Sequence, residues 1–468
     1  MTKQNVKKLT MIICMIFLLL CLAGCKAEKG EKSKAGKGAD IGTEQTEGAN
    51  QEGDDKDGGK NNGKDNTKSN KSSAYDDLTM LNSNRENYCD TGYYFLEEDE
   101  AQRIKYIDYE TKQEIYLCNK PNCKHDNEEC SAYIEDDSEL YVYQDSIYLV
   151  SSSGDRFVMS TGEDDMPIMD TSKEAAVIYR MNLDGTEKEK IFEMPSGIEI
   201  APQVISGQYL YAFFSKSESV QMKDSSFTSV EKERFLAVIN LETGKWEKLM
   251  DGENINIEGV YKDSLIMTRR IYPKDPDEFL DDDAGWRENL KNSDICMFLY
   301  SLGNKKEEKM AQVKDDKMQE IICDGKSVYF LRDNSSAIDC LDLETKEIRT
   351  VAELPGEGAS LMDCEDGKLL YVYFSEESDE GQVKEAYIVD AGTGESKEFT
   401  LLDEDNTYAE RIAENSEYYL VITGYNMTDY YKTWAGTTQR DIENVKYGLI
   451  TKENYWNSKA EYMEIKGV

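Results

Sequence analysis

The chain has 468 residues and a formal net charge of −39, with 94 acidic residues against 55 basic ones. A domain with that charge repels nucleic acid and anionic lipid, so the charge argues against nucleic-acid binding and membrane contact requires a dedicated anchor. Neutral or cationic ligands and divalent cations remain as candidates, and a generic solvated surface also accounts for the acidity.

Residues 1–24 have the pattern of a signal peptide. A basic start is followed by an apolar run over 11–20, which is too short to span a bilayer. The run ends in Leu-Ala-Gly-Cys at 22–25, which resembles the bacterial lipobox. This resemblance implies that the Cys25 thiol is lipidated and that cleavage makes Cys25 the new N-terminus. Two or more acyl chains such as palmitate give stable anchoring. An ordinary secretory peptide with a chance cysteine is the alternative.

Residues 25–74 have the composition of a linker. Gly, Lys, Asn, Asp, Glu and Ser dominate, and the segment buries too little apolar area to offset chain entropy. We therefore expect a disordered tether with a reach on the order of 40 Å. Exported and lipid-anchored in this way, the chain would sit at the outer face of the cell membrane.

Residues 75–468 contain a repeat of two hairpins. The first has an apolar strand, a turn of Asp, Asn, Ser or Gly, and a Tyr-rich strand; the second follows it in step. Turn residues flanked by alternating apolar positions are a strong hairpin signal. The pattern occurs seven times, and its most compact copy is 321–354.

The spacing of these copies predicts an all-β propeller. They start roughly 40 to 60 residues apart, which is the period of propeller blades. Each four-stranded unit has two apolar faces that it cannot bury alone, whereas a ring of such units buries both. Seven blades are expected; a six-bladed ring, a β-sandwich or two smaller all-β domains are the alternatives.

Four long insertions fall between the second and third strands of their blades, so we expect them on one face of the ring. They occupy 151–174, 215–234, 271–295 and 424–445. Loops beyond what the repeat needs are often functional.

The loops of the fourth and seventh blades combine carboxylates with aromatic side chains, which suits a sugar, peptide or protein ligand. The candidate ligand residues are Asp281, Asp282, Asp283, Trp286, Tyr425, Tyr430, Tyr431 and Trp434. Clustered carboxylates also suit Ca²⁺, although no loop has EF-hand spacing. The alternative is that these aromatics only pack the loops down.

The connection between the first two blades holds three cysteines and the chain's single histidine: Cys118, Cys123, His125 and Cys130. Three thiolates and an imidazole can form a closed zinc site. A disulfide is equally open for an exported protein, although it would leave one of the three cysteines over. Reduced, inert thiols are the third alternative. In each case we expect a structural role on the face that carries the insertions.

The sequence contains no catalytic motif that we recognise. It lacks the S-x-D-x-G-x-x-W box of sialidase-type propellers and a G-x-S-x-G elbow. We therefore expect a monomeric, non-enzymatic binding or scaffold module. The alternative function is a surface glycan hydrolase that uses a pair of loop carboxylates.

Taken whole, the chain resembles propeller lipoproteins exported by Gram-positive bacteria, and more loosely TolB-like and YVTN-like propellers. The lipobox, the polar tether, the Tyr-rich blades and the LCNKP-x-C-x-H segment at 117–125 carry the resemblance. It implies an anchored propeller, and TolB-like propellers bind protein partners. The resemblance implies no substrate.

Overall fold

The structure is a computed structural model of the whole chain. It describes residues 77–81, 87–98, 102–135, 137–151, 156–159, 167–170, 175–221, 227–279, 282–315, 318–332, 336–374, 383–402, 407–428, 431–432, 438–439 and 442–467. The expected signal peptide, Cys25 and the whole of the expected linker lie outside these residues. Of the helices in the described ranges, none is long and apolar enough to cross a membrane.

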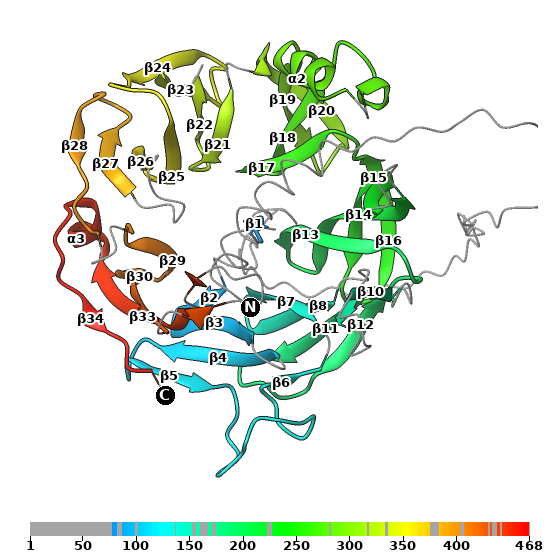
Figure 1. Cartoon of the computed structure of the whole chain (residues 1–468), viewed down its shortest axis with the longest axis vertical. Helices are drawn as coiled ribbons and strands as arrows, with labels where there is room; N and C mark the ends of the chain where they lie inside the picture. The colour runs from blue at the N-terminus through cyan, green and yellow to red at the C-terminus, as the bar shows by residue number, and fades with distance from the viewer. Residues whose placement is uncertain are drawn as a thin grey trace, which may run out of the picture.

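The described strands include seven four-stranded antiparallel blades arranged in a ring (Figure 1), two of which pair with one further short strand. Blade 1 consists of β2 (Tyr88–Cys89), β3 (Gly92–Glu98), β4 (Gln102–Asp108) and β5 (Gln113–Tyr116). Blade 2 consists of β7 (Ser138–Tyr143), β8 (Ser146–Ser151), β11 (Val177–Asn182) and β12 (Glu189–Glu193). Blade 3 consists of β13 (Glu199–Ser206), β14 (Tyr209–Gln221), β15 (Phe227–Asn240) and β16 (Lys245–Asp251).

Blades 4 to 7 continue in the same order. They are β17 (Ile255–Tyr261), β18 (Ser264–Ile271), β19 (Asp294–Ser301) and β20 (Lys306–Lys314); β21 (Gln319–Cys323), β22 (Ser327–Arg332), β23 (Ala337–Asp342) and β24 (Ile348–Glu353); β25 (Ala359–Glu365), β26 (Lys368–Phe374), β27 (Val383–Asp390) and β28 (Ser396–Glu398); and β29 (Glu410–Glu414), β30 (Tyr418–Met427), β33 (Ile442–Thr451) and β34 (Met463–Glu464). The predicted seven-bladed propeller is confirmed, and the six-bladed alternative is wrong.

The apolar core is divided among the blade interfaces. Each of the seven core clusters joins one pair of neighbouring blades. For example, Tyr141 and Ile178 of blade 2 pack with Phe214 of blade 3. Each sheet therefore buries both faces, which explains why a ring this large needs no single central core.

Two surfaces of the ring are named by their loops. The turn face carries the turns between first and second strands and between third and fourth strands. The insertion face, opposite, carries the loops between second and third strands. On the turn face a short helix, α3 (Lys452–Trp456), follows β33, with Thr451 as its N-cap.

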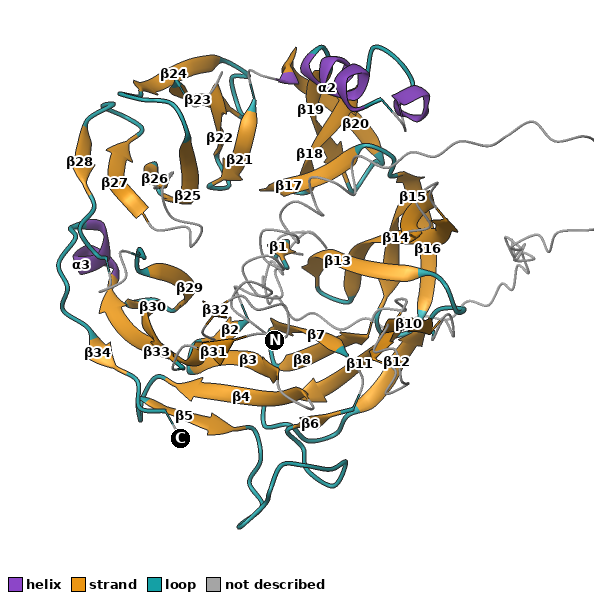
Figure 2. Cartoon of the chain, viewed as in Figure 1, coloured by secondary structure: helices purple, strands orange, loops and turns teal. Residues whose placement is uncertain are grey.

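All four predicted insertions do lie between second and third strands. Blade 2 carries β9 (Arg156–Met159) and β10 (Pro167–Asp170), and blade 3 simply extends β14 and β15. Blade 4 carries η1 (Pro276–Phe279) and α2 (Asp283–Lys291), and blade 7 carries β31 (Tyr431–Lys432) and β32 (Thr438–Gln439) (Figure 2).

The ring closes where blade 7 meets blade 1. Within the described residues no strand is shared between these two blades. Apolar side chains fill the interface, with Tyr93 and Ile107 facing Leu420 and Leu449. At the outer edge Lys466 forms a parallel bridge to β5: its N–H donates to the Lys112 carbonyl (3.0 Å), and its carbonyl accepts from the Glu114 N–H (2.9 Å).

The described chain enters the ring at Asp77, on the turn face. The Asp77 carboxylate accepts hydrogen bonds from Tyr143 Oη, Ser206 Oγ (2.7 Å) and the Gly207 N–H (3.3 Å), which lie at first-to-second strand turns. The next strand, β1 (Thr79–Met80), then pairs antiparallel with β13 near the middle of the ring (Figure 1).

Candidate functional site

The connector between β5 and β7 is the least regular described segment of blades 1 and 2. Residues 117–132 form turns and bends without helix or strand, and then β6 (Tyr133–Ile134) pairs with β4. Figure 1 shows the connector extending outward from the outer edge of blade 1. It therefore lies at the outer rim of the ring, at the insertion-face ends of β4 and β5. Because β6 returns along β4, the intervening loop is directed outward.

The four predicted metal or disulfide residues converge in this connector. One ligand atom from each of Cys118, Cys123, His125 and Cys130 lies within 4.8 Å of the other three. His125 Nδ1 is 3.2 Å from Cys130 Sγ, and all three cysteines are free thiols. Cys130 is buried, and the other three are half-buried. The cluster has the donor set and proximity to hold a metal ion.

The Cys118 and Cys130 thiols differ in how readily they ionise. Burial opposes ionisation at Cys118, but the Lys120 backbone N–H and the neighbouring thiols outweigh it and lower the pKa of this cysteine. Burial raises the pKa of Cys130 to about 11. Cys118 therefore ionises more readily than Cys130.

Blade 1 holds the histidine in place. The Tyr116 ring stacks on the His125 ring at a centroid distance of 4.4 Å, and Arg103 Nε donates to the His125 carbonyl (3.1 Å). Glu97 accepts from both Tyr116 Oη (2.9 Å) and Arg103 (3.1 Å), and it pairs with Lys105 at 2.8 Å. The ligand position is therefore held by side chains of β3, β4 and β5.

In the blade 4 loop, the described candidates have local structural partners. Asp282 is the N-cap of α2, with its carboxylate accepting from the Gly285 N–H (2.9 Å). The Trp286 ring lies 5.4 Å from the Tyr272 ring at a tilt of 44°. Asp283 begins α2, but its side chain and the whole of Asp281 lie outside the described residues.

In the blade 7 loop, Tyr425 is half-buried in β30. Tyr431 is in β31 with an undescribed side chain, and Tyr430 and Trp434 lie outside the described residues. The described parts of these loops therefore contain no carboxylate pair or aromatic platform brought together from different blades.

A cavity that the sequence reasoning missed lies between blades 6 and 7 on the turn face. Its volume is about 510 Å³, and its lining includes Glu365, Lys368, Lys452 and Trp456. Trp456 falls in the most degenerate copy of the repeat. The only sequence feature that could have indicated this cavity is that the first strands of blades 6 and 7 both end in a glutamate, Glu365 and Glu414.

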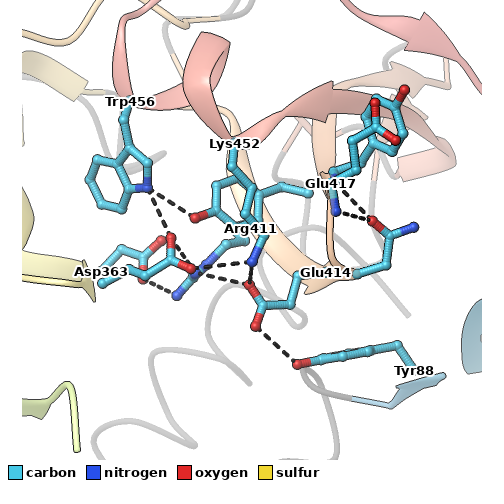
Figure 3. Close-up of polar contacts among 11 residues, drawn as sticks. Tyr88, Asp363, Arg411, Glu414, Glu417, Lys452 and Trp456 are labelled. Carbon is cyan, nitrogen blue, oxygen red and sulfur yellow. Dashed lines mark hydrogen bonds and ion pairs between the residues drawn. The ribbon is translucent and has the colours of Figure 1, made fainter. Parts of the chain in front are cut away.

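A polar network lies beside this cavity and joins blades 6, 7 and 1 (Figure 3). Arg411 bonds to Asp363 (2.5 Å), Lys452 pairs with Glu414 (2.7 Å), and Tyr88 Oη donates to Glu414 (3.4 Å). Burial opposes the charge on Arg411, but the surrounding carboxylates, Asp363 first, raise the pKa of its guanidinium. The network reinforces the ring at its closure.

No protein-family model matches the chain, and no curated protein matches it. Similar solved structures include an oligogalacturonate lyase in complex with manganese, at 12% identity and a TM-score of 0.43, covering 81% of this chain and 92% of that chain. TolB from Acinetobacter baumannii has 11% identity and a TM-score of 0.33 over 79% and 78%. The β-propeller domain of the Trilobed protease from Pyrococcus furiosus has 12% and 0.39 over 80% and 93%. At such identities the likeness concerns the fold alone.

Proposed function

We propose that this protein is a lipid-anchored binding or scaffold module at the outer face of the cell membrane. It presents a sugar, peptide or protein site on the insertion face and carries a structural metal ion in its connector. The observation that carries the proposal is that the long insertions of blades 2, 3, 4 and 7 share one strand junction. The fold itself needs none of them, because blade 5 closes with β22 and β23 separated by only a few residues.

Two exposed apolar side chains lie at the insertion face, where we propose that the ligand binds. Ile271 is 44% exposed and Phe374 is 38% exposed. Each ends the second strand of its blade, and so each lies where the insertion face begins. They are two of the four large apolar side chains exposed in the described residues; the other two, Ile115 and Ile348, lie in the outer strands β5 and β24.

The entry point of the chain suits an anchored module. Asp77 is held at the turn face by Ser206 and Gly207. A chain tethered through Cys25 would therefore join the propeller on the turn face, opposite the insertion face.

We infer that the role is binding and not catalysis. Asp282, one of the loop carboxylates considered for glycan hydrolysis, uses its carboxylate to cap α2. A hydrolase would turn over glycans as a purified protein and lose that turnover when loop carboxylates are replaced; a binding module would retain glycans unchanged.

The test is to replace 273–292 and 428–441 with short Gly-Ser linkers and to measure binding to panels of cell-wall polysaccharides, peptides and surface proteins. Circular dichroism confirms that the propeller survives. A matched control replaces a turn on the turn face, 391–394. The proposal expects binding to disappear in the loop variants and to persist in the control. Unchanged binding in the loop variants would count against it.

A further inference from the structure

We propose that Cys118, Cys123, His125 and Cys130 form a closed structural zinc site that takes the place of secondary structure in the connector. This deepens one part of the proposed function, the connector metal, and is independent of the ligand face. In tetrahedral zinc sites the Zn–S distance is about 2.3 Å and the Zn–N distance about 2.0–2.1 Å, which places ligand atoms about 3.5–3.8 Å apart. The observed spread, with all four atoms within 4.8 Å of one another, needs only a small contraction to reach that geometry.

The donor set selects the metal. Thiolates are soft ligands that favour zinc over calcium, magnesium or manganese, and three thiolates with one imidazole form a common structural zinc set. Since the protein supplies all four ligands, no position stays open for water or substrate. The site is therefore structural, and it contributes no Lewis-acid chemistry.

A disulfide explains the arrangement less well. A bond between any two of the cysteines would leave the third thiol beside His125 with no shared function. Instead His125 Nδ1 faces Cys130 Sγ at 3.2 Å, a contact that a disulfide does not require but a shared metal does. All three side chains are present as free thiols.

The surroundings of His125 provide a second, independent observation. His125 and Asn122 have φ values of 56° and 59°, in the left-handed region that non-glycine residues rarely adopt. Such conformations persist where the surroundings fix them. Here Tyr116 stacks on the His125 ring and Arg103 binds its carbonyl, which directs the imidazole toward the three thiols. Outer-shell contacts commonly orient metal-ligating histidines, and here the contacts are made to the ring face and to the backbone carbonyl.

The ion has a clear structural task. Cys130 and Ala132 belong to the core cluster between blades 1 and 2, together with Leu140 and Ile147. Cys118 and Cys123 pack against the same cluster. Zinc therefore fixes the connector to the interface of two blades, and its loss should loosen that interface without unfolding the others.

The experiment uses the full chain, purified without chelator. We expect one zinc per chain by elemental analysis, and mass spectrometry should find the three connector thiols protected from alkylation until a chelator is added. Cobalt substitution should give the thiolate charge-transfer and d–d bands of a tetrahedral site. Cys123→Ser should abolish these bands, whereas Cys296→Ser, a matched change in β19, should leave them intact.

Less than half an equivalent of zinc together with a disulfide among the three cysteines would overturn the proposal. So would full zinc occupancy in Cys123→Ser. If that variant does not fold, chelator-dependent alkylation of the wild-type connector still decides the matter. These measurements are independent of ligand binding, so failure of the loop-trimming test would leave them unaffected.

Discussion

At the scale of single residues, Glu258 carries a buried carboxyl group on the first, innermost strand of a blade. It is the residue left out of register in the bulge of β17, between Ile257 and Gly259. Its carboxylate accepts from Thr268 Oγ1 at 2.5 Å. Burial raises the pKa of Glu258 above its ordinary value of 4.5, even though Thr268 and Arg270 act in the opposite direction. The folded protein therefore holds this proton more tightly than the unfolded chain does.

The sign of the pH effect follows from that difference. Below pH 4.5 the carboxyl is protonated in both states and costs nothing. As pH rises from 4.5 toward the raised folded pKa, ionisation is easier in the unfolded chain, and the free energy of unfolding falls. Glu258→Gln should therefore stabilise the protein at pH 7, and the gain should vanish below pH 4.5. Urea titrations at several pH values would measure it; a variant less stable than wild type at pH 7 would contradict the assignment.

Arg411 differs from Glu258 in that it neutralises a largely buried charge, the carboxylate of Asp363. Asp363 retains only 10% exposure of its side chain and bonds directly to Arg411. Arg411→Met should lower the free energy of unfolding by about 3 kcal/mol, because it leaves the Asp363 carboxylate without its main cation. Arg411→Met combined with Asp363→Leu should recover most of that loss. A single variant as stable as wild type in denaturant titration would show that the network contributes nothing to closure.

At the scale of elements, Lys466 makes the only pairing between strand edges of the first and last blades in the described residues. Lys466→Pro removes the N–H that donates to the Lys112 carbonyl, at a cost of about 1 kcal/mol. Lys466→Ala keeps the N–H and serves as the control. Hydrogen exchange at 112–116 should accelerate in the proline variant alone. Equal exchange in all three proteins would mean that the edge pairing does not hold the ring closed.

The strands were predictable because turn-forming residues in the sequence mark where each strand ends. The blade at 321–354 places Asp324, Gly325 and Lys346 at its turns, and the positive φ values of Gly325 (78°) and Lys346 (62°) match those positions. The register breaks in the first strands of blades 3 to 7 were not predictable. One skipped residue leaves the alternation on either side nearly intact, so it gives no compositional signal.

The connector was only half predictable. The close spacing of its cysteines and histidine indicated a cluster, and the structure confirms that they meet. Its outward direction depends on β6 pairing with β4, through Gln102–Ile134 and Arg103–Tyr133. That pairing joins residues far apart in sequence, and two-residue strands have no detectable period.

At the scale of the whole molecule, the ring of seven blades followed from the repeat, whereas the cavity between blades 6 and 7 did not. Its lining combines α3 residues with turns of the neighbouring blade. The repeat predicts the strands that all blades have in common, but this cavity depends on features that differ between blades, such as α3 in blade 7. The two faces consequently differ in what they offer: the turn face holds the cavity and the chain entry, and the insertion face holds the long loops.

The anchor is tested at the same scale. Cys25→Ser should abolish incorporation of labelled palmitate and release the protein from the membrane fraction, because a chain with a net charge of −39 is repelled by anionic lipid and needs an anchor. The Lys26→Ser variant, one residue further on, should behave as wild type. Undiminished palmitate incorporation in the Cys25→Ser protein would rule out lipidation at this cysteine.

The most direct test of a ligand on the insertion face is hydroxyl-radical footprinting of the anchored protein on intact cells, compared with the purified protein. The account predicts that protection on cells is concentrated at Ile271, Trp286 and Phe374, on the insertion face. Side chains of the turn face such as Lys368 should react equally in both samples. Protection confined to the turn face, or equal reactivity everywhere, would contradict the proposal that this face receives the partner.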